Sequence, residues 1–91
     1  MKQCIDQPKV NARLRKIEGQ IKAISGMIEK DIPCEDILIQ INAIKSAVHK
    51  VGQLILEGHL NHCVKEAIEH GNADEAIKKF EKAVDYFAKM K

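Results

Sequence analysis

Apolar residues recur along most of this chain at alternating steps of four and three positions. In residues 34–69 the repeat is carried by six residues: Ile37, Ile41, Ile44, Val48, Val51 and Ile55. Such heptad spacing keeps an apolar stripe on one side of a helix and is typical of a helix that packs along a partner helix. No proline interrupts this segment. The pattern therefore predicts one long helix over about residues 33–70.

A second stripe with the same spacing precedes the long helix and predicts a helix over about residues 8–30. Pro8 suits the first turn of this helix, and Pro33 suits the start of the next one. The connection between them is short, so we expect the first two helices to be antiparallel neighbours. The stripe consists of Val10, Leu14, Ile17, Ile21, Ile24 and Ile28.

A third helix is predicted over about residues 73–89. Gly71 suits the left-handed position that follows a helix, and Asn72 with Glu75 has the spacing of a capping box. The buried stripe of this helix is expected to be Ile77, Phe80, Val84 and Phe87. No strand pattern or internal repeat is present, so the predicted fold class is all-α, with three helices in a single domain of residues 1–91. Residues 1–7 are expected to form a flexible arm.

The stripe of the long helix is symmetric in position about residue 46. If a second chain places the same helix antiparallel to the first, each apolar residue of one stripe meets an apolar residue of the other stripe. The spacing therefore predicts a twofold-symmetric helical-bundle dimer. Within one straight helix, Cys34 and His59 lie roughly 37 Å apart and cannot share a ligand. The dimer would instead bring Cys34 of one chain beside His59 and Cys63 of the other.

Composition and charge narrow the class of protein. Only three of the 91 side chains are aromatic, so a three-helix monomer would be marginally stable and burial between chains is expected. The absence of a long apolar run argues against a signal peptide or membrane span, and we expect a cytoplasmic protein with reduced thiols. Residues 1–30 hold seven basic residues against three acidic ones, which makes this segment the place to expect an anionic partner; the alternative is a solvated helix face.

The candidate chemistry lies in Cys34, His59 and Cys63. His59 and Cys63 are four residues apart and share one helix face, and two thiolates with one imidazole suit Cu(I), or zinc if a fourth ligand is added. The alternative is that both cysteines are small buried apolar residues. His62 points about 100° away from Cys63 and is expected to face solvent. The role of Cys4 stays open.

No arrangement of residues supports catalysis, because there is no phosphate-binding loop, no carboxylate pair at working separation, and no nucleophile with a base. The sequence therefore predicts a binding protein and not an enzyme.

Three segments resemble the copper-sensitive operon repressor (CsoR/RcnR) family. They are residues 13–20 (RLRKIEGQ), 34–41 (CEDILIQI) and 59–63 (HLNHC). The resemblance implies an all-helical antiparallel dimer that pairs into a homotetramer, and a transcriptional repressor that leaves its operator DNA when an inducer binds. It also implies a Cu(I) site made of Cys34 from one chain and His59 and Cys63 from the other. It assigns DNA binding to Arg13 and Lys50, to which charge and helix face add Lys9 and Lys16.

Two positions depart from the copper sensors of this family. Pro33 stands where they commonly have tyrosine, and Lys79 stands where they commonly have glutamate; in the family those residues couple the ligand histidine to DNA binding. Glu81 or Tyr86 could substitute for them. The departures favour an alternative inducer, a persulfide or other reactive sulfur species acting on Cys34 and Cys63 as a redox dithiol with no metal. A helical metal-storage or carrier protein is a third hypothesis, although such proteins usually carry more thiols.

Overall fold

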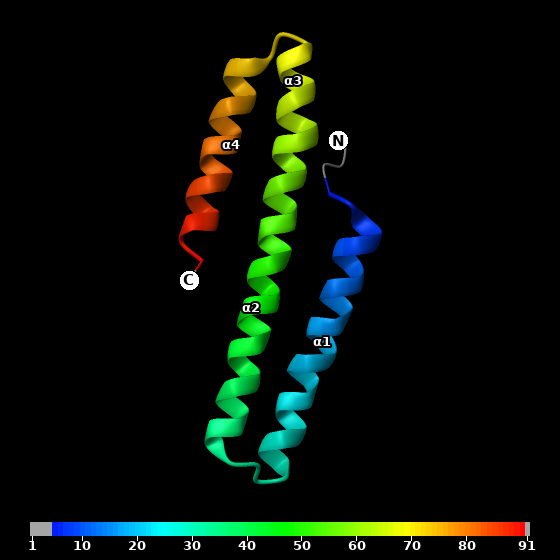
Figure 1. Ribbon diagram of the computed structural model, residues 1–91, viewed down its shortest axis with the longest axis vertical. Helices are drawn as coiled ribbons and strands as arrows, with labels where there is room; N and C mark the ends of the chain where they lie inside the picture. Colours follow the sequence, from blue (N-terminus) through cyan, green and yellow to red (C-terminus); the bar gives the residue numbers. More distant parts are fainter. Residues whose placement is uncertain (1–4, 91) are drawn as a thin grey trace. The chain divides into compact units, whose positions relative to one another are not determined.

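The computed structural model describes residues 5–90, and every regular element in that range is a helix (Figure 1). The elements are α1 (Gln7–Glu29), α2 (Cys34–Gly58), the π-helix η1 (His59–Val64), α3 (Lys65–Glu69) and α4 (Ala73–Ala88). Because α2, η1 and α3 follow one another without a break, the chain forms three helical segments. The predicted all-α class with three helices is confirmed. None of the described helices is both long enough and apolar enough to cross a membrane.

Residues 8–51 form one compact unit, a hairpin of α1 and the first part of α2. At the end of α1, the Asp31 amide donates to the Ile28 carbonyl (3.2 Å) and the Ile32 amide to the Met27 carbonyl (3.1 Å). This bonding pattern is a Schellman motif. It requires the left-handed backbone that Asp31 adopts, with φ of 55°. The Pro33 carbonyl then accepts the amides at positions 36 and 37 and begins α2.

Residues 52–90, with residues 5–7, form the second compact unit, in which α4 packs against η1 and α3. The same Schellman motif ends α3, here with Gly71 at φ of 81°. The expected capping box is wrong, because the Asn72 side chain makes no cap hydrogen bond at the start of α4. Glu75 instead forms an ion pair with Lys79, four residues further along the helix (3.3 Å).

Burial divides each predicted stripe into two alternating halves. In the stripe of α1, Val10 and Ile17 are buried and Ile24 is half-buried. The stripe of α2 behaves in the same way, and its covered half is Ile37, Ile44 and Val51. The exposed halves are Leu14, Ile21 and Ile28 in α1, and Ile41, Val48 and Ile55 in α2. Half of the α2 stripe is therefore already covered within the chain. Only the exposed halves of the two stripes are left for a second chain to contact.

Candidate metal centre

The three sequence-predicted ligands lie in two places along the chain. Cys34 occupies the first turn of α2, where its thiol is free and exposed. His59 and Cys63 lie in η1, which begins directly after the last residue of α2. Cys63 is disulfide-bonded in this structure, whereas the sequence predicts a reduced thiol. Metal binding at Cys63 requires reduction, because a thiolate is the ligand form. Cys4 lies outside the described residues.

The η1 segment is unusual in its backbone. A π-helix closes i→i+5 hydrogen bonds and is rare; it occurs mostly as a single turn inserted in an α-helix, often at a functional site. Here the inserted turn covers residues 59–64 and contains His59, His62 and Cys63. The apolar spacing does not predict this turn, because it continues the helical pattern of α2 into residues 59–64.

His59 is fixed by its contact with α4. Its imidazole stacks on the Phe80 ring, with centroids 5.8 Å apart and planes 18° from parallel. The His59 Nε2 atom is buried and has no hydrogen-bond partner in the part of the chain that the structure describes. A buried imidazole nitrogen without a partner is costly unless a ligand or ion occupies it. Packing therefore orients the ring and leaves one nitrogen available.

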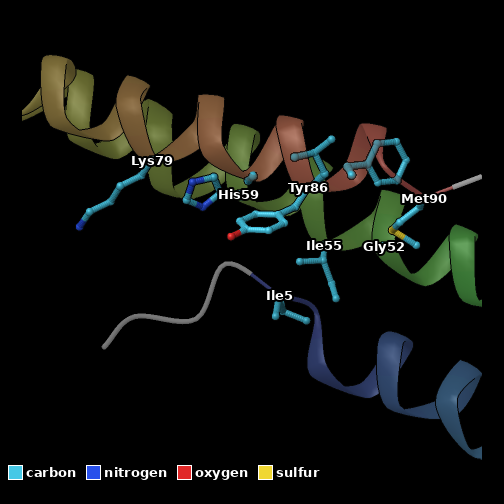
Figure 2. Close-up of a pocket in the computed structure, with 10 residues that line it drawn as sticks. Ile5, Gly52, Ile55, His59, Lys79, Tyr86 and Met90 are labelled. Carbon is cyan, nitrogen blue, oxygen red and sulfur yellow. The ribbon is translucent and has the colours of Figure 1, made fainter.

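Figure 2 shows His59 beside Lys79 and Tyr86 at the edge of an open apolar groove of about 460 Å³. Tyr86, one of the two residues considered as a substitute for the altered positions, lines this groove together with His59. The Lys79 ammonium lies 3.3 Å from the Glu75 carboxylate, and both side chains are mostly exposed. Lys79 therefore pairs with Glu75 along α4. The ring of His59 is positioned by its stacking contact with Phe80.

The side chain of His62 is 40% exposed, and its ring also has two neighbours in the same helical segment. Its Nδ1 atom lies 3.8 Å from the Cys63 sulfur. Its Nε2 atom lies 3.4 Å from an oxygen of Glu66, one turn further along the helix. The imidazole therefore stands between a sulfur and a carboxylate. The spacing of four between His62 and Glu66 was the signal in the sequence that could have indicated this pair.

A second open groove, of about 580 Å³, collects these side chains on the unit formed by residues 52–90. Its lining includes His59, His62, Cys63 and Glu66. Even so, residues 5–90 contain no group of three or more histidine, cysteine or acidic side chains that could hold a metal ion. The described part of one chain therefore brings together no complete set of metal ligands.

The candidate DNA-binding residues lie in the unit formed by residues 8–51. Lys9, Arg13 and Lys16 occupy α1 at spacings of four and three, which places them on one helix face. All three are exposed, whereas Lys50 in α2 is half-buried.

Comparisons with known proteins agree with an all-helical metal sensor. Residues 6–86 match the family described as metal-sensitive transcriptional repressor. The chain is 39% identical over 85 residues to the copper-sensing transcriptional repressor CsoR of Bacillus subtilis, covering 93% of this chain and 81% of that protein. Two solved structures are similar in fold. One is the Cu(I) form of the copper-sensing repressor CsoR of Geobacillus thermodenitrificans NG80-2, with a TM-score of 0.85, 38% identity, and coverage of 92% of this chain and 88% of that one.

The other is the nickel-responsive transcriptional regulator InrS, with a TM-score of 0.83, 33% identity, and coverage of 96% of this chain and 97% of that one. Fold and sequence together define the class of protein, a helical transcriptional repressor. The chain belongs to the metal-sensitive transcriptional repressor family, as the resemblance found in the sequence implied.

Proposed function

We propose that this protein represses transcription by binding operator DNA and leaves the DNA when Cu(I) occupies a site shared between two chains. Cys34 of one chain and His59 and Cys63 of the other are the ligands. The observation that carries the proposal is the incompleteness of the site: the free Cys34 thiol begins α2, while the other two ligands follow its end. Such a protein acts in the cytoplasm, where the operator is.

The residues present fit a monovalent copper ion. Two thiolates and one imidazole form a soft donor set, which selects Cu(I) over hard cations. The partnerless Nε2 atom of His59 supports a role for this imidazole in holding an ion. Bound copper would link the two chains through sulfur. The similarity to copper-sensing relatives favours Cu(I) as the inducer. The similarity to a nickel-responsive regulator makes a divalent ion the alternative.

The exposed halves of the two apolar stripes support a dimer as the working unit. Six branched aliphatic side chains along α1 and α2 remain exposed in the single chain. Exposed branched aliphatic side chains that recur along helices in this way favour a protein interface. Antiparallel pairing of two copies of α2 brings the beginning of one α2 beside the end of the other, as the shared site requires. Pairing of two dimers into a homotetramer is part of the proposal.

DNA binding is assigned to Lys9, Arg13, Lys16 and Lys50. Basic side chains that contact phosphates release counterions, so affinity falls steeply with salt. Replacing Arg13 with alanine should weaken binding to every DNA sequence and lower the salt slope by about one unit. Glu18→Ala, a change of the opposite charge on the same helix, is the matched control. An unchanged slope in the Arg13 variant would remove it from the phosphate contacts.

The copper response is tested by titrating the reduced protein on fluorescent operator DNA. Copper should release the wild-type protein, and Cys34→Ala should bind DNA normally but ignore copper. Cys4→Ser is the control, because it removes a thiol outside the proposed ligand set and should keep the response. DNA affinity that stays unchanged by copper in the wild-type protein would contradict the copper mechanism.

The second candidate inducer is a persulfide. The exposed thiol of Cys34 and the replacement of the coupling residues by Pro33 and Lys79 favour it. The Cys34 thiolate would attack the outer sulfur of a persulfide RSSH, giving a Cys34 persulfide and RSH. The Cys63 thiolate of the other chain would then attack the Cys34 sulfur, forming a disulfide and releasing HS⁻. Mass spectrometry of donor-treated protein should detect the Cys34–Cys63 link; absence of any adduct would exclude this mechanism.

A further inference from the structure

The disulfide of Cys63 is a feature that neither proposed inducer explains. The chain contains three cysteines. Cys63 is disulfide-bonded, whereas Cys34 is a free, exposed thiol. A disulfide of Cys63 within one chain therefore requires Cys4 as the other cysteine. This pairing differs from the link between Cys34 and Cys63 of two chains that a persulfide would form.

The described residue next to Cys4 lies close to η1. Ile5 follows Cys4 directly in the sequence and lines the open apolar groove that His59 also lines (Figure 2). Ile5 and η1 belong to the same compact unit. His59 and Cys63 are four residues apart in η1, about 6 Å along the helix. Consecutive Cα atoms are about 3.8 Å apart, and a disulfide joins Cα atoms about 4.4–6.8 Å apart. A thiol one residue before Ile5 can therefore reach this part of the chain.

From these observations we infer that Cys4 and Cys63 form a reversible disulfide within one chain, and that this disulfide switches off the inducer site. The inference rests on the proposed function, because it takes Cys63 as a ligand. Metal binding needs the thiolate form of cysteine, which a disulfide does not provide. An oxidised site keeps only the Cys34 thiolate and the His59 imidazole, so the repressor should stay on DNA in the presence of copper.

A hydroperoxide, ROOH, is the class of oxidant that closes this switch. The Cys63 thiolate attacks the outer oxygen, which gives a Cys63 sulfenic acid and the anion RO⁻. The Cys4 thiolate then attacks the sulfenic sulfur, forms the S–S bond and expels hydroxide. The two protons lost by the thiols convert these anions into ROH and water, so two electrons pass from the sulfurs to the O–O bond. Cys63 lines an open groove of about 580 Å³, which gives a small peroxide access to it.

The disulfide and the candidate DNA-binding face belong to different units of the chain. Lys9, Arg13 and Lys16 belong to the unit formed by residues 8–51, whereas Cys63 belongs to the other unit. Oxidation should therefore leave DNA affinity close to its value in the reduced protein and remove only the response to copper. In a reducing compartment such a disulfide is transient, so the response returns when the oxidant is consumed.

Peptide mass spectrometry tests the pairing in the full-length protein. Reduced, metal-free protein is treated with one equivalent of hydrogen peroxide, and the remaining thiols are alkylated before digestion. The expected product is a Cys4–Cys63 peptide from chains that run as monomers on a non-reducing denaturing gel, with Cys34 alkylated. Cys4→Ser should give no disulfide-linked monomer, and Cys34→Ser should still give it.

The seating of Ile5 in the groove is tested by equilibrium in glutathione redox buffers. Ile5 is half-buried, so Ile5→Ala should shift the disulfide toward the free thiols by roughly threefold to fivefold. Ile39→Ala is the matched control, because it removes the same atoms from an isoleucine of α2 that is 63% exposed and outside the groove. An equal shift in both variants would show that the groove does not position the N-terminal segment.

Copper affinity tests the effect of the disulfide on the site. After the peroxide is removed, Cu(I) affinity is measured without oxygen by competition with a chromophoric chelator. The oxidised wild-type protein should bind Cu(I) at least about a hundredfold more weakly than the reduced protein, because one of three ligands is lost. A thiol reductant should restore the affinity. Reduced Cys4→Ser should bind Cu(I) as tightly as the reduced wild-type protein.

Failure of this inference differs from failure of the proposed function. If only a Cys34–Cys63 link between chains appears, or if the disulfide within the chain leaves Cu(I) affinity unchanged, the redox switch is wrong. Reduced Cys63→Ala then decides the fate of the copper site. A loss of Cu(I) in that variant keeps the shared site, whereas full affinity would show that Cys63 is not a ligand.

Discussion

Replacing Ile41 with alanine should weaken the dimer without unfolding the chain. Ile41 belongs to the exposed half of the α2 stripe and keeps 45% of its surface exposed in the single chain. Full burial of an isoleucine side chain contributes about 1.5–3 kcal/mol, so a partner that covers this fraction adds about 0.7–1.4 kcal/mol. Twofold symmetry doubles the effect. The loss of about 1.5–3 kcal/mol corresponds to a roughly tenfold to hundredfold weaker dimer.

Sedimentation equilibrium over a dilution series measures this change directly. The matched control is Ile39→Ala, which removes the same atoms from the same helix. Ile39 is 63% exposed but lies about 160° around α2 from Ile41. The dimer constant should stay near the wild-type value in Ile39→Ala. An unchanged constant in Ile41→Ala, or an equal loss in both variants, would refute the role given to the exposed stripe.

Further changes test the local structure. Asp31→Gly should raise the free energy of unfolding by up to about 1 kcal/mol, because glycine accepts the left-handed backbone at no steric cost, and Gly71→Ala should lower it by about 1–2 kcal/mol. Chemical denaturation at one fixed protein concentration checks both, and a loss in Asp31→Gly would contradict the strain assigned there. Phe80→Leu should weaken Cu(I) binding by up to about tenfold, since a stacked pair contributes about 0.5–1.5 kcal/mol to holding the ring of His59. Chelator competition measures it, and an unchanged affinity would show that stacking does not orient the ligand.

The sequence was sufficient for the helices because their signals are local. The heptad stripes, Pro33 and Gly71 correspond to the observed start of α2 and the turn after α3. Periodicity could not tell which half of each stripe the single chain covers. That division depends on how the helices of a chain lie against their neighbours, and both halves have the same residue types and spacing. Ile41 and Ile44 are equivalent in the apolar pattern, yet Ile41 is exposed and Ile44 is half-buried.

The candidate site was harder to foresee than the fold. Spacing singled out His59 and Cys63, but an ideal α-helix was assumed where the backbone forms a π-turn. The sequence predicted that His62 faces solvent, and its side chain is 40% exposed, but the pattern did not predict the contacts of its ring with Cys63 and Glu66. The stack of His59 on Phe80 joins residues 21 positions apart, so it depends on how α4 packs against η1 and not on local sequence.

Mixed dimers test most directly the claim that one metal site is built from two chains. Cys34→Ala and Cys63→Ala chains with different affinity tags are purified as a heterodimer and loaded with Cu(I) under reducing conditions. A shared site leaves one intact set, made of Cys34 from one variant and His59 with Cys63 from the other. The account predicts one tightly bound copper per heterodimer and none in either homodimer. A heterodimer without tightly bound copper, or a homodimer that keeps it, would contradict the account.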